Sequence, residues 1–190
     1  LVLDACAGSG GKTTHLAMLM NNNGRIIAAD KNISSLQALN QEVRRLGIEI
    51  IETHPMDLNL GLPVEFQSSF DLVLVDAPCS GTGTLRRNPE IKWRLQPADV
   101  EKSTVLQEKI LHRASQAVKK GGRLIYCTCS LLSAENENIV ERFLSAYREF
   151  CFGSPPSFLP KSLFDRGLFL RTYPHVHGTD GFFAAILERR

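Results

Sequence analysis

The sequence predicts an α/β protein built on a mostly parallel sheet with helices on both faces. Short apolar stretches alternate with segments of helical periodicity along most of the chain. Several of the apolar stretches end in an acidic residue, and the carboxyl ends of parallel strands form the edge where ligands bind. The clearest stretch is 70–76, whose central Leu-Val-Leu-Val is apolar at consecutive positions, as expected for a strand covered on both faces. It delivers Asp76 and, after Pro78, the thiol of Cys79 to that edge.

Each expected element follows from local pattern and punctuation. Strands are expected over 1–4, 25–30, 48–52, 70–76, 123–129 and 181–188, and helices over 13–22, 33–46, 100–119 and 133–147. Apolar residues at three- and four-residue steps support the helix over 33–46, which Gly47 ends. The helix over 100–119 is expected to bury residues that include Val105 and Val118, before a Lys-Lys-Gly-Gly turn. Ser133 is the expected N-cap of the helix over 133–147, and 151–170 carries too many prolines and glycines for a prediction.

Composition limits the class of protein without naming its partner. The 190 residues are 43% hydrophobic, which suits one domain with a sizeable core, and the net charge of +2 argues neither for nor against nucleic acid. The five cysteines are odd in number and form no CxxC pair, so we expect reduced thiols and a cytoplasmic setting. No signal peptide is visible, and no apolar run reaches the roughly 18–20 residues of a membrane span.

The chain does not begin with Met, and residues 1–4 already read as a core strand. A domain rarely starts on its central strand without a lead-in. We therefore expect a single domain over 1–190 that is truncated at its N-terminus.

A small-residue loop, Ala-Cys-Ala-Gly-Ser-Gly-Gly-Lys at 5–12, joins the first strand to the first helix and predicts a ligand in close backbone contact. A Walker A loop would need Gly where Cys6 stands, six residues before Lys12. A dinucleotide fingerprint starting at Gly8 would need a third Gly where Thr13 stands. The remaining interpretation is a nucleoside cofactor without a pyrophosphate, such as S-adenosylmethionine, with its amino-acid end against the loop.

Three acids at successive strand ends support that interpretation. Asp30 lies 22 residues after Gly8, close to the offset of about 20 expected for a ribose-binding acid. Asp57 follows the third strand on the same edge and is placed to border an adenine, and Asp76 ends the fourth strand. The competing interpretation is that each acid only caps the next turn. Three acids at three successive strand ends favour the interpretation as a ligand-binding edge.

Two strand-end thiols, Cys79 and Cys129, suggest covalent chemistry. A thiolate that adds to C6 of a cytosine makes C5 able to attack a sulfonium methyl, and this reaction also needs an acid near N3 and a base for the C5 proton. Asp76 beside two thiols meets that demand. Cys6, Cys127 and Cys151 are better interpreted as small core hydrophobes. Although Cys127 and Cys129 share a face by strand periodicity, no further ligands complete a metal site, and we expect none.

These motifs resemble the Sun/Fmu group of RNA cytosine-C5 methyltransferases over essentially the whole chain. The resemblance rests on Asp-Ala-Pro-Cys-Ser-Gly at 76–81 together with Thr-Cys-Ser at 128–130, on the loop at 4–13, on Arg-Asn-Pro-Glu-Ile-Lys-Trp at 87–93 and on His-Gly-Thr-Asp-Gly-Phe-Phe at 177–183. In DNA cytosine methyltransferases the Pro-Cys thiol is itself the nucleophile. The second thiol at Cys129 favours the RNA group.

The resemblance implies a Rossmann-like, S-adenosylmethionine-dependent methyltransferase fold of about seven strands, mostly parallel with the last antiparallel. It makes Cys129 the nucleophile, lets Cys79 assist product release, and places Asp76 against N3 of the cytosine. The expected cofactor-binding residues are Cys6, Ala7, Gly8, Ser9, Gly10, Gly11, Lys12, Asp30, Asp57 and Asp76. The family's loop commonly reads Ala-Pro-Gly-Gly-Lys, so Gly8 and Ser9 loosen the turn here and are expected to alter cofactor affinity.

The expected partner is RNA, ribosomal RNA before tRNA, with the protein a monomer. Arg86, Arg87, Lys92 and Arg94 surround Trp93 and suit phosphate contact with base stacking; the alternative is a solvated loop with Trp93 in the core. His175 and His177 are expected to be structural. Two other functions compete: a catalytically silent RNA-binding relative, and a nicotinamide-dependent oxidoreductase, which the failed dinucleotide fingerprint disfavours.

Overall fold

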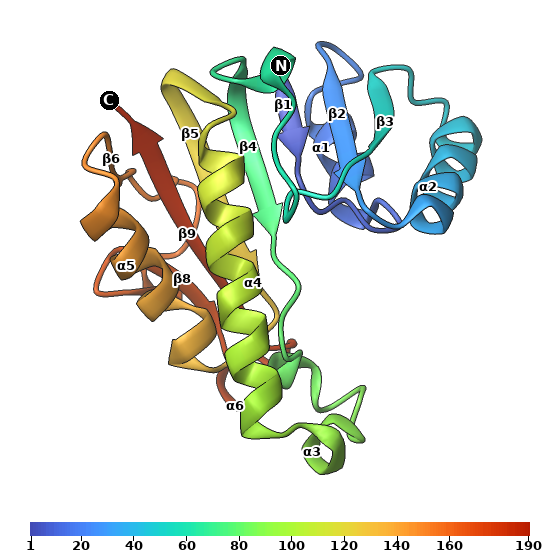
Figure 1. The fold of residues 1–190 in the computed structure, drawn as a ribbon. Helices are drawn as coiled ribbons and strands as arrows, with labels where there is room; N and C mark the ends of the chain where they lie inside the picture. Colours follow the sequence, from blue (N-terminus) through green and yellow to red (C-terminus); the bar gives the residue numbers. More distant parts are fainter.

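A computed structural model describes residues 1–190 (Figure 1). Its strands are β1 (Val2–Asp4), β2 (Ile26–Asp30), β3 (Ile51–Pro55), β4 (Phe70–Asp76), β5 (Val118–Thr128), β6 (Phe150–Phe152), β7 (Phe164–Asp165), β8 (Phe169–Thr172) and β9 (Phe182–Arg189). Its helices are α1 (Gly11–Leu19), α2 (Ile33–Leu46), α3 (Ile91–Arg94), α4 (Pro97–Ser115), α5 (Glu137–Ala146) and α6 (Pro174–His177). Short 3₁₀ turns occupy Val64–Phe66, Thr82–Thr84, Ser133–Glu135 and Lys161–Leu163.

All strands belong to one sheet in the order β3-β2-β1-β4-β5-β9-β8-β7, with β6 also paired to β9. The pairs from β3 to β5 are parallel, and β9 runs antiparallel to β5, which confirms the predicted fold class and the antiparallel last strand. The sheet has nine strands rather than about seven. The additional strands β6, β7 and β8 come from the stretch around 150–172, where prolines and glycines interrupt the sequence pattern but long-range pairing with β9 supplies the hydrogen bonds.

Helices cover both faces of the sheet (Figure 1). Alternate residues of the parallel strands enter different cores: Val2 and Ile26 pack with α1 and α2, whereas their neighbours Leu3 and Ile27 pack in the larger core beneath α4 and α5. Because side chains alternate across a strand, one apolar strand serves two helical layers. No helix combines the length and the apolar character that crossing a membrane requires.

Two elements begin at residues other than those predicted, because capping hydrogen bonds at helix ends outweigh the intrinsic propensity of the residues there. The third strand begins at Ile51 and not at Ile48, since the Ile48 N–H completes the end of α2 by bonding the Val43 carbonyl at 3.0 Å beyond the left-handed Gly47. Helix α4 begins at Pro97, where Gln96 and Asp99 form a capping box, and it ends at Ser115.

Several expected details of the helices were wrong. Val105 is 49% exposed and not buried. Val118 lies in β5 and not in the helix. The expected Lys-Lys-Gly-Gly turn is part of β5, whose pairing with β4 is irregular at this point. Ser133 is not a helix N-cap: residues 133–135 form a 3₁₀ turn, and α5 starts at Glu137. The first helix covers Gly11–Leu19, starting inside the glycine-rich loop.

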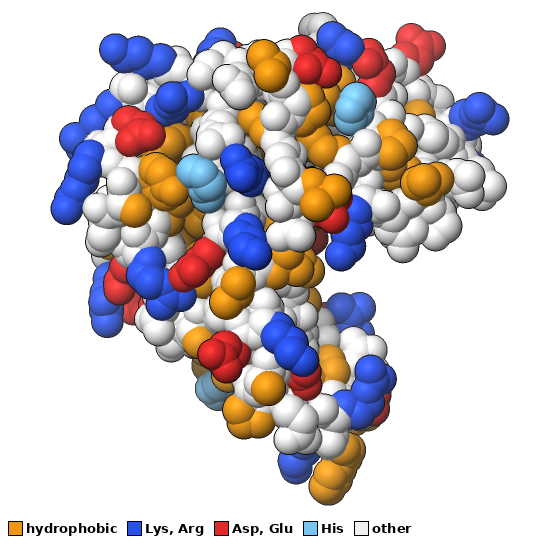
Figure 2. All heavy atoms as spheres, viewed as in Figure 1, with side chains coloured by type: hydrophobic (Ala, Val, Ile, Leu, Met, Phe, Trp, Pro, Cys, Tyr) orange, Lys and Arg blue, Asp and Glu red, His pale blue; other side chains and the backbone are white.

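The carboxyl ends of β1, β2, β4 and β5 meet at one edge of the sheet, and Asp76 at the end of β4 pairs in register with Cys127 of β5. Figure 2 shows the surface hollowed between the part that carries β1 to β3 and the projecting segment that carries α3, with basic side chains on both sides of the hollow. The chemistry-bearing residues therefore gather beside this hollow.

Candidate active site

A cleft of about 310 Å³ opens at this edge and brings together the three predicted strand-end acids, Asp30, Asp57 and Asp76. Of the loop at 5–12, only Ala5 and Cys6 line it. The complete lining is Ala5, Cys6, Asp30, Lys31, Asn32, Ser35, Met56, Asp57, Leu58, Asp76, Pro78, Leu106 and Ile110. Carboxylates on one side and apolar residues such as Met56 and Leu58 on the other suit a ligand with hydroxyl or amino groups and an apolar ring.

The remaining loop residues shape the cleft from behind. The Gly8 N–H donates to Oδ2 of Asp30 at 2.8 Å, and the Asn32 N–H donates to its Oδ1 at 2.8 Å. Gly8 adopts a φ of +53°, a left-handed conformation that glycine adopts without strain. This backbone conformation explains why Gly stands here where the family's loop commonly has Ala. Asp57 accepts the Asn59 N–H at 2.8 Å. These acids do cap local turns, but each carboxylate oxygen keeps a second lone pair for a ligand.

A further acid, Asp4, lies buried beneath the loop. Its Oδ2 accepts a hydrogen bond from the Thr13 hydroxyl at 2.7 Å, and its Oδ1 has no partner. Burial raises the pKa of Asp4 to about 6, with Asp76 adding to the rise and Thr13 opposing it. A buried acceptor without a donor is the kind of atom that a bound ligand satisfies. The sequence analysis gave Asp4 no role, although it ends a strand as Asp30 and Asp76 do, and this shared position was the signal that could have identified it.

Asp76 joins the cleft to the thiols. Its Oδ2 lies 2.7 Å from the Lys12 ammonium, and its Oδ1 lies 3.5 Å from Sγ of Cys127. Burial alone would lower the pKa of Lys12, but the hydrogen bond and the charge of Asp76 raise it. Lys12 also lies 5.3 Å from the centroid of the Phe182 ring. The Asp76 carboxylate therefore contacts two separate segments directly, and a third, at Phe182, through Lys12.

The two predicted thiols meet. Sγ of Cys79 and Sγ of Cys129 are 3.2 Å apart, and both residues are half-buried. The hydrogen bond from the Cys79 thiol lowers the pKa of Cys129 to about 7, against the effect of burial. The same bond, with burial, raises the pKa of Cys79. The pair can therefore hold one thiolate near neutral pH, at Cys129, stabilised by a neighbouring thiol that keeps its proton.

The other cysteines differ from this pair. Cys127 is buried against Asp76, and burial raises its pKa well above the ordinary value. Its hydrogen-bond partner is Asp76, whereas that of Cys129 is Cys79. Burial also raises the pKa of Cys6, although this residue lines the cleft. No group of three His, Cys, Asp or Glu side chains is placed to hold a metal ion.

The Cys129 turn is packed closely against two glycines. The Gly83 N–H donates to the Cys129 carbonyl at 2.8 Å, and the Gly181 N–H donates to the Gly83 carbonyl at 2.8 Å. A Cβ on Gly83 would lie 2.1 Å from the Gly181 carbonyl oxygen and 2.7 Å from that of Cys129. Only glycine fits there, so three distant segments converge behind this thiol.

The predicted RNA-binding residues fall into two groups. Arg86 and Arg87 both pair with Asp180, and Arg86 also donates to the Gly178 carbonyl at 2.6 Å. Lys92 and Arg94 lie on the projecting α3, where the Lys92 ammonium is 5.5 Å from the centroid of the Trp93 ring. Trp93 is 79% exposed, so the alternative that it packs in the core is wrong.

His177 is structural, as predicted: its Nδ1 accepts the Tyr173 N–H at 2.9 Å. The structure does not show a comparable bond for His175, whose ring stands 5.7 Å from that of Tyr173.

The sheet order, the cleft at the carboxyl edge and the paired thiols beside an acid define the class of protein as a Rossmann-like methyltransferase. Comparison with known proteins then gives the family. The model of the 16S rRNA methyltransferase RsmB/F family matches residues 1–188, and the chain belongs to that family.

Relatives and solved structures agree with this assignment. The chain is 36% identical over 195 residues to the probable ribosomal RNA small subunit methyltransferase B of Bacillus subtilis, covering 100% of this chain and 43% of the relative. It is 35% identical over 206 residues to the mouse 28S rRNA (cytosine-C(5))-methyltransferase, covering 99% of this chain and 25% of that protein. The structure of NSun6 from Pyrococcus horikoshii with SFG superposes with a TM-score of 0.86 at 30% identity, covering 100% of this chain and 47% of that one. The chain thus spans less than half the length of these proteins.

Proposed function

We propose that this chain carries the catalytic part of an enzyme that transfers a methyl group from S-adenosylmethionine to C5 of a cytidine in ribosomal RNA. The observation that carries the proposal is the pair of strand-end thiols, with Sγ atoms 3.2 Å apart, in a protein whose Asp76 lines the adjacent cleft. The names of the relatives, which include a 28S rRNA (cytosine-C(5))-methyltransferase, support the base and the RNA class.

The cleft fits the cofactor by its chemistry. Asp30 and Asp57 offer carboxylate oxygens to ribose hydroxyls and the adenine edge, and Met56 and Leu58 offer apolar surface. The loop at 5–12 and the unpartnered Oδ1 of Asp4 would receive the amino-acid end. When bound, S-adenosylmethionine supplies a methyl group made electrophilic by its sulfonium.

The residues of this chain would activate the base. The Cys129 thiolate adds to C6 of the cytosine, so that an S–C6 bond forms and the electrons of the C5–C6 double bond move toward N3. Asp76 would pass a proton to N3 as the electrons move there, which neutralises the charge that develops, while Lys12 holds the Asp76 side chain in place. The electron-rich C5 then accepts the methyl group.

Release requires the C5 proton. Cys79, in contact with Cys129, would assist the removal of that proton. As the S–C6 bond breaks, Cys79 gives its own thiol proton to the sulfur of Cys129 and takes the C5 proton in its place. The electrons of the C5–H bond re-form the double bond, those of the S–C6 bond stay on the sulfur, and the N3 proton returns to Asp76. Cys129 then loses its proton to solvent before the next cycle.

The exposed Trp93 with Lys92 and Arg94 on α3 would contact the RNA strand near the target base, since aromatic rings stack on bases and cations pair with phosphates. Arg86 and Arg87 share the single carboxylate of Asp180 and retain excess positive charge for the same strand.

The test uses the full-length protein with S-adenosylmethionine carrying a labelled methyl group, and unmodified 16S rRNA or tRNA as substrate. Mass spectrometry of the digested nucleosides should find labelled 5-methylcytidine in the rRNA. Preferential labelling of tRNA would move the substrate to the alternative class. RNA binding without labelling of any RNA would leave a catalytically silent RNA-binding protein.

A further inference from the structure

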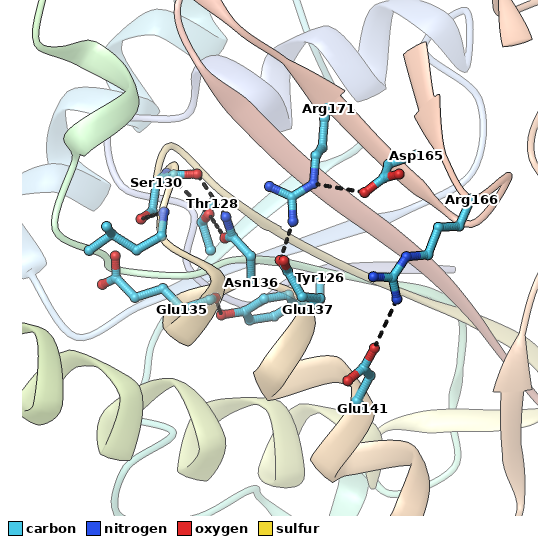
Figure 3. A network of polar contacts seen from close by, with 11 residues as sticks. Tyr126, Thr128, Ser130, Glu135, Asn136, Glu137, Glu141, Asp165, Arg166 and Arg171 are labelled. Atoms are coloured by element: carbon cyan, nitrogen blue, oxygen red, sulfur yellow. Dashed lines mark hydrogen bonds and ion pairs between the residues drawn. The ribbon is translucent and has the colours of Figure 1, made fainter. Parts of the chain in front are cut away.

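Two buried polar residues, Glu135 and Asn136, lie beneath the thiols and belong to neither the cleft nor the RNA surface. Both are 0% exposed, at the junction between the 3₁₀ turn 133–135 and α5. Figure 3 shows them among Tyr126, Thr128 and Ser130 at the end of β5. Their burial calls for an explanation, because an uncompensated polar group in a core is costly.

Glu135 holds the turn of Cys79. Its Oε1 accepts the Ser80 backbone N–H at 2.9 Å, and its Oε2 accepts the Ser80 hydroxyl at 2.5 Å. Gln107 of α4 donates to Oε1 of Glu135 at 3.2 Å and to the Pro78 carbonyl at 2.9 Å. The residues on either side of Cys79 are thus tied to one carboxyl group and its partner amide.

Asn136 holds the turn of Cys129 in the same way. Its Oδ1 accepts the Thr128 hydroxyl at 2.6 Å, and its Nδ2 donates to the Ser130 carbonyl at 2.9 Å (Figure 3). Again the residues on both sides of the cysteine are bound, and the thiol itself contacts only Cys79 among the hydrogen-bond partners of the turn.

Glu135 and Asn136 are consecutive, so one peptide unit links the two turns. The Tyr126 hydroxyl fixes that unit by donating to the Glu135 carbonyl at 2.7 Å. Glu135 forms no ion pair with any Lys or Arg; every side-chain contact that it makes is to a hydrogen-bond donor from the Cys79 turn or from Gln107. Its placement is therefore explained by the thiol geometry and not by charge neutralisation.

We propose that Glu135 is a positioning residue that sets the contact between the Cys79 and Cys129 thiols by holding Ser80. The importance of that contact for methylation rests on the function proposed above, but the contact itself can be measured without it. Loss of the Glu135 side chain frees the Cys79 turn, separates the sulfur atoms, and leaves the Cys129 thiolate without its hydrogen-bond donor.

The test measures alkylation of Cys129 by iodoacetamide across pH 5.5 to 9.5 on the full-length protein, with peptide mass spectrometry to assign the site. The wild-type rate should reach half its maximum near pH 7, the pKa of Cys129. Glu135→Ala should move this midpoint toward the value of a free cysteine, about 8.5, and slow alkylation at pH 7 about tenfold. Glu135→Gln should retain the wild-type midpoint, because its oxygen can accept the Ser80 N–H and its amide can donate to the hydroxyl.

Glu137→Gln is the matched control. Glu137 lies two residues after Glu135 and pairs with the buried Arg171 of β8. The variant therefore weakens a buried ion pair without changing either thiol turn. Its alkylation midpoint should equal that of the wild type. Cys79→Ala should reproduce the full shift of Glu135→Ala.

Ser80→Ala removes the hydroxyl bond to Glu135 and the longer contacts with the Thr82 and Ser130 hydroxyls, but it keeps the backbone bond to Glu135. It should shift the midpoint in the same direction by a smaller amount, which keeps the test valid if Glu135→Ala does not fold. A wild-type midpoint in a folded Glu135→Ala, or in Ser80→Ala when that variant alone is folded, would overturn the proposal. Wild-type protein that shows the predicted alkylation profile but methylates no RNA would overturn the proposed function and leave the positioning role in place.

Discussion

The carboxylates of Asp30 and Asp57 in the cleft accept hydrogen bonds from residues no more than 22 positions away, whereas the Cys79 and Cys129 turns are also tied to more distant residues. Asp30 and Asp57 each bond a backbone amide two residues onward, and Asp30 also accepts the Gly8 N–H. The Cys79 turn bonds Glu135, 55 residues beyond Ser80, and the Cys129 carbonyl bonds Gly83. Both regions lie at one edge of the sheet, but the cleft needs correct strand ends, while the thiol centre needs the whole domain to be folded.

This difference suggests that the two regions can be damaged separately. Changes in the cleft should weaken cofactor binding and leave the chemistry of the thiol pair unchanged. Changes at the thiol centre should affect the reaction and leave cofactor affinity unchanged. Asp76 belongs to both, because it lines the cleft and ends β4 three residues before Cys79.

The largest effect is expected for Cys129→Ala, which removes the thiol that we propose as the nucleophile. The methylation rate should fall by about a thousandfold or more, because without the covalent step C5 is not nucleophilic. The measurement is labelled methyl incorporation into RNA. Cys127→Ala provides the matched control, since Cys127 lies two residues earlier but is buried and not in contact with Cys79; most activity should remain. A Cys129→Ala enzyme with near wild-type turnover would remove the distinction between the two thiols.

Asp76→Asn tests the residue that both regions share. The rate should fall by about a hundredfold, the scale of losing one acid-base group, and cofactor affinity should fall less because Asp30 and Asp57 remain. Single-turnover kinetics at saturating cofactor separate the two effects. An Asp76→Asn variant that lost only cofactor affinity would place Asp76 in the cleft alone.

Asp30→Ala should act on the cleft alone. Losing a carboxylate that hydrogen-bonds a ribose is expected to cost about 1.5 kcal/mol, or about tenfold in the cofactor Kd, measured by isothermal titration calorimetry with S-adenosylmethionine. The pH midpoint of Cys129 alkylation should not change in this variant. A shift of that midpoint would show that the two regions are coupled.

The last prediction concerns Asp4, where the expected effect is on the pH dependence of stability and not on the reaction. Its pKa of about 6 lies above the unfolded value of 3.8, so between these pH values the native state binds more protons than the unfolded state. The free energy of unfolding should therefore fall as pH rises through that window, by on the order of 3 kcal/mol from this group.

Asp4→Asn should lose that pH-dependent part of the stability and be more stable than wild type by about 1 kcal/mol at pH 7, once the weaker bond from Thr13 is allowed for. Urea unfolding at pH 4 and pH 7 measures both. Equal pH slopes for the two proteins would show that Asp4 ionises freely in the native state.

The sequence predicted what local patterns determine. Apolar runs ending in Asp30, Asp57 and Asp76, and thiols at Cys79 and Cys129, were enough to predict that these groups share one edge, because parallel strands align their carboxyl ends. The strands paired to β9 were not predictable, since their support comes from distant hydrogen bonds and not from their own residues.

The support beneath the thiols was missed for the same reason. Glu135 reads as an acid in the first turn of a helix, a position that favours acids for the helix dipole alone. Its true partners, Ser80 and Gln107, lie 55 and 28 residues away. The motif Glu-Asn-Glu at 135–137 was a signal, because three consecutive polar residues between apolar segments carry no helical periodicity.

The most direct test of the two-thiol account is trapping of the covalent intermediate. Full-length wild type, Cys79→Ala and Cys129→Ala proteins are incubated with S-adenosylmethionine and unmodified 16S rRNA, then separated under denaturing conditions to detect a protein–RNA adduct. Cys79→Ala should accumulate the adduct, because release is blocked after Cys129 has added to C6, and Cys129→Ala should form none. An adduct in Cys129→Ala that is absent from Cys79→Ala would make Cys79 the nucleophile and contradict the account.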